Sequence, residues 1–319
     1  MLASFKGNSQ IKALALALGI VLVVPFLVVG DSTGSVSTLY VDKNTSEKQD
    51  GTKEYPFEKI SQAISKVKDN DGTKIYVAQG EYKENFNIPE DAQVIGAGKD
   101  KTIIKGDDDE DAVVYMEHGT KLQGVTVKDG KVGILVKKNS RAEISSVIVK
   151  DNDKEGVLAL EAYDKGSRYA LTVSDSTIKD NGRSGVYAEK RSVVIVDSTL
   201  YENNWNGVAV SKDSKLWLED SKIRDNEKSG VHITLDESDI FVIDCDIEDN
   251  VREGLEINVF AKGGYAKIDN TNFDDNGRYG IARLDRAPGT SDSLWKDVEI
   301  KKNTFDGNGL GTVSPIIQL

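Results

Sequence analysis

The chain has 319 residues, a net charge of −12, one cysteine and only two histidines. The negative charge argues against nucleic-acid binding, which depends on lysine and arginine side chains that neutralise phosphates. A single cysteine, Cys245, excludes an intramolecular disulfide, so an exported chain of this length would need a large apolar core instead.

The N-terminus carries an uncharged apolar segment at residues 13–29, preceded by Lys6 and Lys12. This order of basic residues and an apolar run is typical of a signal peptide or an N-terminal membrane anchor. As a helix the segment would extend about 26 Å, at the short end for crossing a bilayer. We expect residues 1–30 to be this segment, cleaved or retained, and residues 31–39 to be a linker. The protein is then extracytoplasmic, either secreted or anchored to the membrane through residues 13–29.

A short amphipathic helix is predicted just after Pro56, because apolar residues recur there at helical spacing. These residues are Phe57, Ile60, Ile64 and Val67. Such a helix would cover the open first coil of a stacked fold. Alternating segments at 74–78 and 93–96 are then predicted to be the first strands.

The acidic run at 107–111 (DDDED) supplies carboxylate oxygens, the ligand type that calcium prefers. The run lacks the spaced alternation and the glycine of a defined calcium loop. We therefore predict a solvated loop and no resident cofactor, with weak calcium binding left open.

From residue 152 onward the sequence repeats the motif Asn-x-x-x-Gly, with successive glycines 22–31 residues apart. A last pair, Asn308 and Gly311, is one residue shorter. Because Asn and Gly tolerate a left-handed backbone, we expect both to form the corners of successive coils. The repeat predicts an all-β fold, a single-stranded right-handed parallel β-helix of roughly eight to ten coils, over residues 40–319. The complete pairs are Asn152/Gly156, Asn181/Gly185, Asn203/Gly207, Asn226/Gly230, Asn250/Gly254 and Asn276/Gly280.

A short alternating strand follows each glycine of the motif. In the strand after Gly185, the period of two turns Val186 and Ala188 inward and Tyr187 outward. A second inward pair precedes each Asn, and Cys245 falls in that series. We therefore interpret Cys245 as part of the core rather than as a reactive thiol.

Residues 40–106 read YVDKN…DGTKEYPFEKISQAISKVKDNDGTKIYVAQGEYKENFNI…VIGAGKDKTIIKG. With this opening and the repeats of residues 134–311, the chain resembles the pectin-lyase-like superfamily, especially pectin methylesterases and DUF1565/NosD-type proteins with PbH1 repeats. The resemblance implies a solenoid fold but no particular activity, because the superfamily includes lyases, hydrolases, esterases, epimerases and proteins without known activity. We find none of the catalytic motifs of pectin methylesterases, polygalacturonases, pectate lyases or mannuronan epimerases in the sequence.

Equivalent outward residues of neighbouring coils should stack about 4.8 Å apart on the strand that follows the corner. The first predicted column is Leu158, Tyr187, Ala209, His232, Glu256 and Ala282. The second is Leu160, Glu189, Ser211, Thr234, Asn258 and Leu284. Polar residues thus occupy the middle of both columns, and the adjoining corner adds Trp205, Arg252, Glu253, Arg278 and Tyr279.

We interpret this polar region as a candidate carbohydrate site. Trp205 or Tyr279 would stack on sugar rings. His232 and Glu256, on neighbouring coils, would form an acid/base pair, with Glu253 as a third catalytic candidate. Exposed strand faces also carry polar residues without a function, so a purely solvent-exposed role stays open. The candidate ligand-binding residues are Tyr187, Glu189, Trp205, Arg252, Asn258, Arg278 and Tyr279.

Three functions remain open at this point. The first is non-catalytic interaction with extracellular or cell-envelope carbohydrate. The second is a polysaccharide lyase, glycosidase or epimerase with a non-standard site, and the third is a structural or adhesive surface protein. The expected partners are a polysaccharide or envelope glycan and, through the N-terminal segment, the membrane. The net charge argues against acidic polymers such as pectate unless cations bridge the two.

Overall fold

The computed structural model describes most of the chain after residue 36. The described ranges are 37–45, 48–68, 72–107, 111–162, 170–285, 298–315 and 317–318. The expected signal or anchor segment and the middle of the acidic run, 108–110, lie outside them. Within these ranges, no helix has the length and apolar character needed to span a bilayer.

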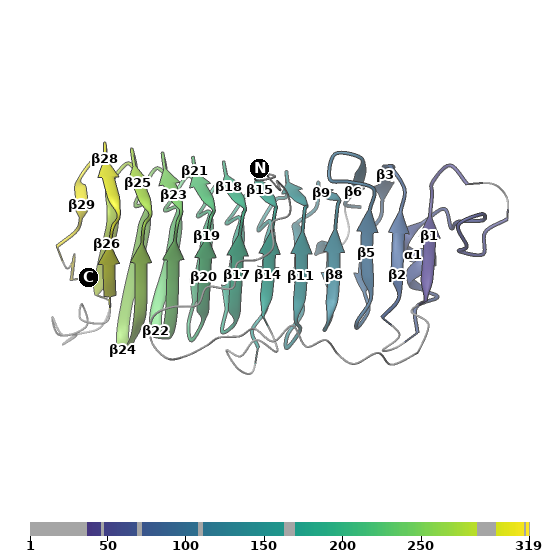
Figure 1. The fold of residues 1–319 in the computed structure, drawn as a ribbon, viewed down its shortest axis with the longest axis horizontal. Coiled ribbons are helices and arrows are strands. Elements are labelled where there is room, and N and C mark those ends of the chain that lie inside the picture. Colours follow the sequence, from purple (N-terminus) through teal and green to yellow (C-terminus); the bar gives the residue numbers. More distant parts are fainter. Residues whose placement is uncertain are drawn as a thin grey trace, which may run out of the picture. The chain divides into compact units, whose positions relative to one another are not determined.

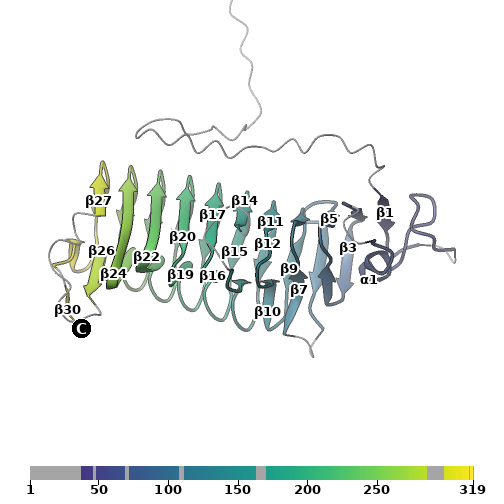
Figure 2. The same cartoon turned by 90° about the horizontal axis from the view of Figure 1, so that it is seen from below.

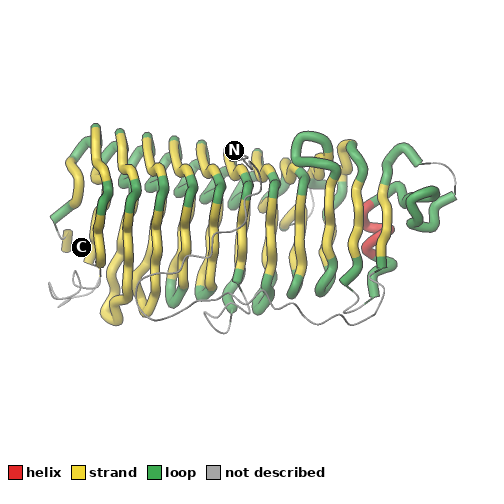
Figure 3. The backbone as a smooth tube through the Cα atoms, in the orientation of Figure 1, coloured by secondary structure: helices red, strands yellow, loops and turns green. Residues whose placement is uncertain are grey.

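The described strands form a parallel β-helix, in which each coil adds one strand to each face of the stack (Figures 1 and 3). Two faces merge into one twenty-stranded sheet, and the third face is a separate ten-stranded sheet. The predicted fold class is confirmed. We name the faces in the order in which the chain visits them after each Asn-x-x-x-Gly corner.

Face 1 follows that corner. Its strands are β4 (Phe86–Ile88), β7 (Ala112–Met116), β10 (Val132–Val136), β13 (Val157–Ala159), β16 (Val186–Glu189), β19 (Val208–Ser211), the first parts of β22 (Val231–Ile243) and β24 (Leu255–Asp269), then β26 (Tyr279–Asp285), β29 (Gly311–Val313) and β30 (Ile317–Gln318).

Face 2 comes next along each coil, and the long strands β22 and β24 join it to face 1. It comprises β1 (Thr38–Val41), β2 (Lys74–Val77), β5 (Gln93–Gly96), β8 (Thr120–Gln123), β11 (Ala142–Ser145), β14 (Leu171–Ser174), β17 (Ser192–Val196), β20 (Lys215–Glu219), the second parts of β22 and β24, and β27 (Val298–Lys301).

Face 3 is the ten-stranded sheet that leads back to the next corner. It comprises β3 (Gly80–Lys83), β6 (Thr102–Lys105), β9 (Thr126–Lys128), β12 (Ile148–Lys150), β15 (Thr177–Lys179), β18 (Thr199–Tyr201), β21 (Lys222–Arg224), β23 (Asp246–Glu248), β25 (Asn272–Asp274) and β28 (Thr304–Asp306).

The core contains the residues that strand alternation turns inward, including Val186 and Ala188, which are fully buried. Cys245 is also in the core, with 2 % of its surface exposed. Burial raises the pKa of its thiol to about 12, so Cys245 is neither a thiolate nor a reactive group at neutral pH. The prediction that Cys245 packs in the core is confirmed.

The motif asparagines form a continuous hydrogen-bonded ladder inside the corner. Asn203 is fully buried, and its amide Nδ2 donates to Oδ1 of Asn226 on the next coil at 3.0 Å. The same amide group donates to the backbone carbonyls of Ile178 and Tyr201, while Asn203 Oδ1 accepts a bond from Asn181. Each asparagine therefore satisfies polar groups of adjoining coils that would otherwise be buried without partners.

At the six complete pairs, the expected left-handed backbone of the asparagine and the glycine is wrong. The left-handed residue there is instead the acidic one immediately before the asparagine, for example Glu202 with φ 52°. The glycine is required by close packing: a Cβ on Gly207 would lie 2.5 Å from Ile223 Cγ2 and 2.8 Å from the Gly230 carbonyl oxygen. The full left-handed series is Asp151, Asp180, Glu202, Asp225, Asp249 and Asp275.

The predicted N-terminal helix is present as a short helix, α1 (Ile60–Ile64), beside β1 (Figure 2). Its buried residues Ile60 and Ala63 belong to the same core as the strands. The carboxylate of Glu84 accepts hydrogen bonds from the backbone N–H groups of Ile60 and Ser61, which a helix leaves free at its start. This contact holds α1 on the first coils.

Candidate functional site

The strand register of face 1 stacks the predicted outward residues as the repeat spacing indicates. Tyr187 on β16 pairs with Ala209 on β19, and His232 on β22 pairs with Glu256 on β24. Thr234 pairs with Asn258 in the second column. The register of the two columns is therefore as predicted. The expectation that both columns are exposed is wrong at the buried positions, which are Ala209, Glu256, Asn258, Ala282 and Leu284.

Glu256 lies at the centre of a buried polar cluster, with 2 % of its side chain exposed. His232 Nδ1 lies 3.4 Å from its Oε1, and Asn258 Nδ2 donates to the same oxygen at 3.1 Å. Ser229 Oγ donates to Oε2 at 2.8 Å, and Arg252 Nη2 lies 3.5 Å from Oε2. Both carboxylate oxygens are thus surrounded by donors.

These contacts determine the protonation state of Glu256. Burial raises the pKa of its carboxyl group, but the hydrogen bond and charge of His232, with the hydrogen bonds from Asn258 and Ser229, outweigh burial and lower the pKa to about 2. Glu256 is therefore ionised at neutral pH. It can orient His232 or accept a hydrogen bond, but it cannot serve as a proton donor.

Glu253 is held by the two arginines of the same corner. Its Oε1 lies 2.9 Å from Arg278 Nη1, and its Oε2 lies 3.3 Å from Arg252 Nε and accepts a bond from Ser229 Oγ at 3.3 Å. The Glu253 side chain is 2 % exposed, whereas the two arginines are 48 % and 38 % exposed. The cluster therefore presents guanidinium groups outward over buried carboxylates.

Tyr187 and Glu189 form a separate group on β16. Tyr187 Oη lies 3.3 Å from Ser211 Oγ and 3.5 Å from Glu189 Oε2. The other oxygen of Glu189 pairs with Lys212 at 2.7 Å.

Tyr279, at the start of β26, is half-buried. The structure therefore brings six of the predicted residues into the cluster around Glu256 (His232, Arg252, Glu253, Glu256, Asn258 and Arg278), with Tyr187 and Glu189 in their own group.

Trp205 lies at the corner that leads into β19 and is 40 % exposed. Arg183 on the preceding coil has its guanidinium carbon 5.1 Å from the centre of the indole ring, and Lys228 Nζ on the following coil lies 3.9 Å from it. Cations at these distances are attracted to the face of the ring. The indole is therefore held in one orientation while much of its surface stays in contact with solvent.

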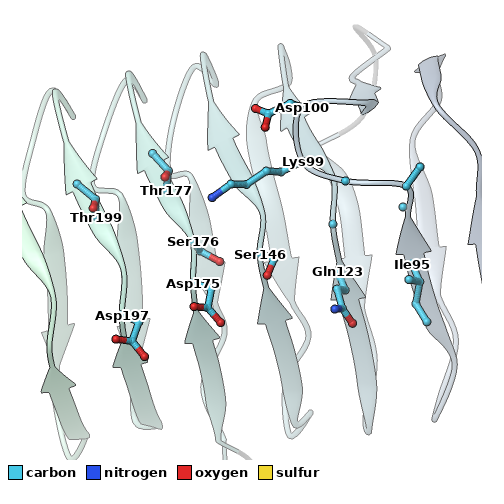
Figure 4. A pocket seen from close by; sticks show the side chains of 14 residues that line it. Ile95, Lys99, Asp100, Gln123, Ser146, Asp175, Ser176, Thr177, Asp197 and Thr199 are labelled. Atoms are coloured by element: carbon cyan, nitrogen blue, oxygen red, sulfur yellow. The ribbon is translucent and has the colours of Figure 1, made fainter. Parts of the chain in front are cut away.

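A groove of about 770 Å³ lies at another corner, where the chain passes from face 2 to face 3 (Figure 4). Figure 4 shows Asp175 and Asp197 at equivalent positions of neighbouring coils within it. Burial, with the charges of Asp175 and Asp220, raises the pKa of Asp197. The sequence analysis did not predict this row of aspartates, although a repeated Asp-Ser-Thr indicates it at residues 175–177 and 197–199.

The family described as "Periplasmic copper-binding protein (NosD)" matches residues 65–234, more than half of the chain. The chain belongs to the NosD family. The description "Right handed beta helix region" matches residues 163–314. No curated protein matches the chain.

Solved structures similar to this NosD-family chain include a pectate lyase, Pel9A, with a TM-score of 0.60, 15 % identity, and coverage of 85 % of this chain and 81 % of the other. The A-module of the mannuronan C-5 epimerase AlgE6 from Azotobacter vinelandii has a TM-score of 0.52, 14 % identity, and coverages of 81 % and 93 %. ORF18 of Geobacillus virus E2 has a TM-score of 0.60, 15 % identity, and coverages of 88 % and 60 %. At these identities the likeness concerns the fold alone.

The described residues do not fit a copper centre. Copper favours imidazole, thiolate and thioether ligands. The two core residues that could supply sulfur, Met116 and Cys245, are buried, and the histidines, His118 and His232, lie on coils far apart in the stack. Within the part of the chain that the structure describes, no three His, Cys, Asp or Glu side chains are grouped to hold a metal ion.

Proposed function

We propose that this NosD-family chain is an extracytoplasmic β-helix protein that binds carbohydrate of the cell envelope or its surroundings without cleaving it. The apolar segment at 13–29 and the periplasmic description of the family support an extracytoplasmic location. The segment would deliver the protein across the membrane or hold it there.

The observation that carries the binding proposal is the exposed indole of Trp205. An exposed aromatic ring is the usual platform for the apolar face of a sugar, because stacking removes apolar surface from water on both sides. Trp205 is 40 % exposed, although the side chains of Arg183 and Lys228 lie over its ring. Arg183 and Lys228 reduce the freedom of the ring before any ligand arrives. A ring that is already oriented loses less entropy on binding, which favours affinity.

The contacts of the two buried glutamates argue against hydrolysis by a pair of carboxylates. Hydrolysis by paired carboxylates requires one that is protonated and can donate to the leaving oxygen. Glu256 is ionised, and Glu253 is paired with two arginines. Neither carboxylate is therefore suited to that role.

The proposal is tested with the purified full chain and a panel of neutral and acidic polysaccharides, with and without calcium. Affinity electrophoresis measures binding, while new reducing ends and the absorbance of unsaturated sugars measure cleavage in the same samples. We expect at least one polymer to retard the protein, with no cleavage product. Trp205→Ala should weaken that binding about tenfold or more. Tyr201→Ala on face 3 is the matched control and should bind as the unmodified chain does.

An enzymatic function is the second candidate, favoured by the contact between the half-exposed His232 and the ionised Glu256. A carboxylate in that position can orient the imidazole of His232 for abstraction of a proton beside a sugar carboxylate, the first step of a lyase or epimerase. Cleavage that disappears in both His232→Ala and Glu256→Ala would replace the binding proposal with this one. If no polymer is bound or cleaved, both proposals fail and a structural or adhesive role takes their place.

A further inference from the structure

The position two residues after the asparagine of each complete Asn-x-x-x-Gly pair forms a row of cations with one tryptophan, which we call the corner track. Backbone hydrogen bonds connect the row from coil to coil: Trp205 N donates to the Arg183 carbonyl at 3.3 Å, and Lys228 N donates to the Trp205 carbonyl at 2.9 Å. The same pairing continues from Lys228 to Arg252 and from Arg252 to Arg278. The backbones of consecutive members are therefore about 4.8 Å apart. The corner track is Lys154, Arg183, Trp205, Lys228, Arg252 and Arg278.

Buried carboxylates neutralise only some of the cations of the corner track. Arg183 pairs with Glu155 at 3.3 Å, where the arginine is 43 % exposed and the glutamate 9 %. Arg252 and Arg278 pair with the buried Glu253 in the same manner. Among the residues that the structure describes, no carboxylate lies within ion-pair distance of Lys228, whose ammonium group faces the Trp205 ring.

We propose that the corner track binds a linear polysaccharide that carries carboxylates, lying along the stack. This inference rests on the carbohydrate binding proposed above and names its ligand class. Five of the six coils offer one cation each to the polymer, and the sixth offers Trp205 as the stacking surface for one sugar ring. The outward guanidinium groups suit carboxylates, which arginine binds through two parallel N–H donors.

The net charge of −12 repels an acidic polymer. This repulsion must be compared with the attraction by the cations of the corner track. At 0.15 M ionic strength the screening length is about 8 Å, which weakens repulsion by carboxylates elsewhere on the surface. Contacts at hydrogen-bond distance keep most of their strength. Under the proposal, the contacts of the corner track outweigh this screened repulsion at physiological salt.

A similar arrangement on face 3 differs from the corner track in how its cations are paired. Tyr201 also lies between two cations, with Lys179 Nζ 5.1 Å and the Arg224 guanidinium carbon 4.3 Å from its ring centre. Both of those cations, however, pair with an acidic neighbour, Lys179 with Asp180 at 2.9 Å and Arg224 with Asp225. The Tyr201 ring thus lies between two cations as Trp205 does, but acidic neighbours neutralise both of them. Tyr201 and its two cations therefore serve as an internal control.

The test compares polygalacturonate with the same polymer after its carboxyl groups have been reduced to alcohols. Binding to the full chain is measured by affinity electrophoresis in 0.15 M salt with a chelator, so that calcium cannot bridge the partners. We expect reduction of the carboxyl groups to weaken binding at least tenfold. Lys228→Gln should weaken polygalacturonate binding about tenfold, while Arg224→Gln leaves it unchanged. Thermal unfolding of both variants verifies that the fold is intact.

Each alternative outcome identifies what fails. Equal binding of the reduced polymer overturns the acidic ligand class but leaves carbohydrate binding in place. Binding of neither polymer, together with no binding across the neutral panel, overturns the proposed function itself. If single-stranded poly-dT binds as tightly as polygalacturonate, the corner track is a general polyanion surface, and the inference is wrong.

Discussion

Glu256 illustrates how an outward residue of a strand can become a buried ion. Strand alternation places it on the surface of face 1, and the sequence alone predicts an exposed side chain there. The long side chain of Arg252 and the neighbouring His232, Asn258 and Ser229 surround it instead. The charge survives burial because each carboxylate oxygen has at least two neighbouring donor groups or cations.

The lowered pKa of Glu256 gives stability a specific pH dependence. Because the folded pKa is about 2 and the unfolded pKa is near its ordinary value of 4.5, this group stabilises the fold fully above about pH 5. That contribution is lost as the pH falls from 4.5 toward 2. In Glu256→Gln we expect the free energy of unfolding at pH 7 to fall by about 3 kcal/mol and its slope between pH 4.5 and 2.5 to become smaller. Urea unfolding at a series of pH values measures both.

The matched control for this prediction is Glu189→Gln, which removes a carboxylate paired with Lys212 at the surface. Its effect on the free energy of unfolding should stay below about 1 kcal/mol. If Glu256→Gln leaves the pH slope of the unmodified chain intact, Glu256 is not the buried ion described above.

At the scale of the element, the corner depends on three different residues for three different reasons. The acidic residue supplies the left-handed turn, as Glu202 does with φ 52°, the asparagine supplies hydrogen bonds, and the glycine permits contact with the next coil. The repeat spacing predicts where the corner lies and what asparagine does there. It does not predict which residue is left-handed, because Asp and Asn are both enriched in that region and stand next to each other at most of these corners.

Removing one asparagine from the middle of the ladder should be costly. Asn203→Ala removes the side-chain oxygen that accepts a hydrogen bond and the side-chain NH2 group that donates. The carbonyls of Ile178 and Tyr201 then lose the hydrogen bonds from that NH2 group. We expect the free energy of unfolding to fall by about 2–4 kcal/mol, since several buried polar groups lose partners together. Chemical denaturation monitored by circular dichroism measures the loss.

Asn308→Ala is the matched control at the last described corner, where Asn308 Oδ1 accepts from Asn276 but the ladder continues no further. It should cost about 1 kcal/mol. Equal losses for the two variants would show that the ladder does not stabilise the fold through bonds to both neighbouring coils.

At the scale of the whole molecule, the repeat of Asn-x-x-x-Gly predicts the fold class and the register of face 1 correctly. His232 and Glu256 are neighbours, as their positions after the corner glycines indicate. The sequence does not predict the protonation state of Glu256 or the ion pairs of Glu253, because both depend on how long side chains fold over the corner. The corner track was visible in part as Trp205, Arg252 and Arg278, but its continuity required the ladder of backbone bonds.

The most direct test of the account is oxidative footprinting of tryptophan in the complex with the polysaccharide that binds. Trp205 lies in the corner track, whereas Trp217 lies on face 2, stacked on Phe241 with ring centres 5.0 Å apart. We predict that a saturating polymer protects Trp205 from oxidation and leaves the reactivity of Trp217 unchanged. If Trp205 is oxidised equally fast in the free and the saturated protein, the carbohydrate does not occupy the corner track, and the account of its function is wrong.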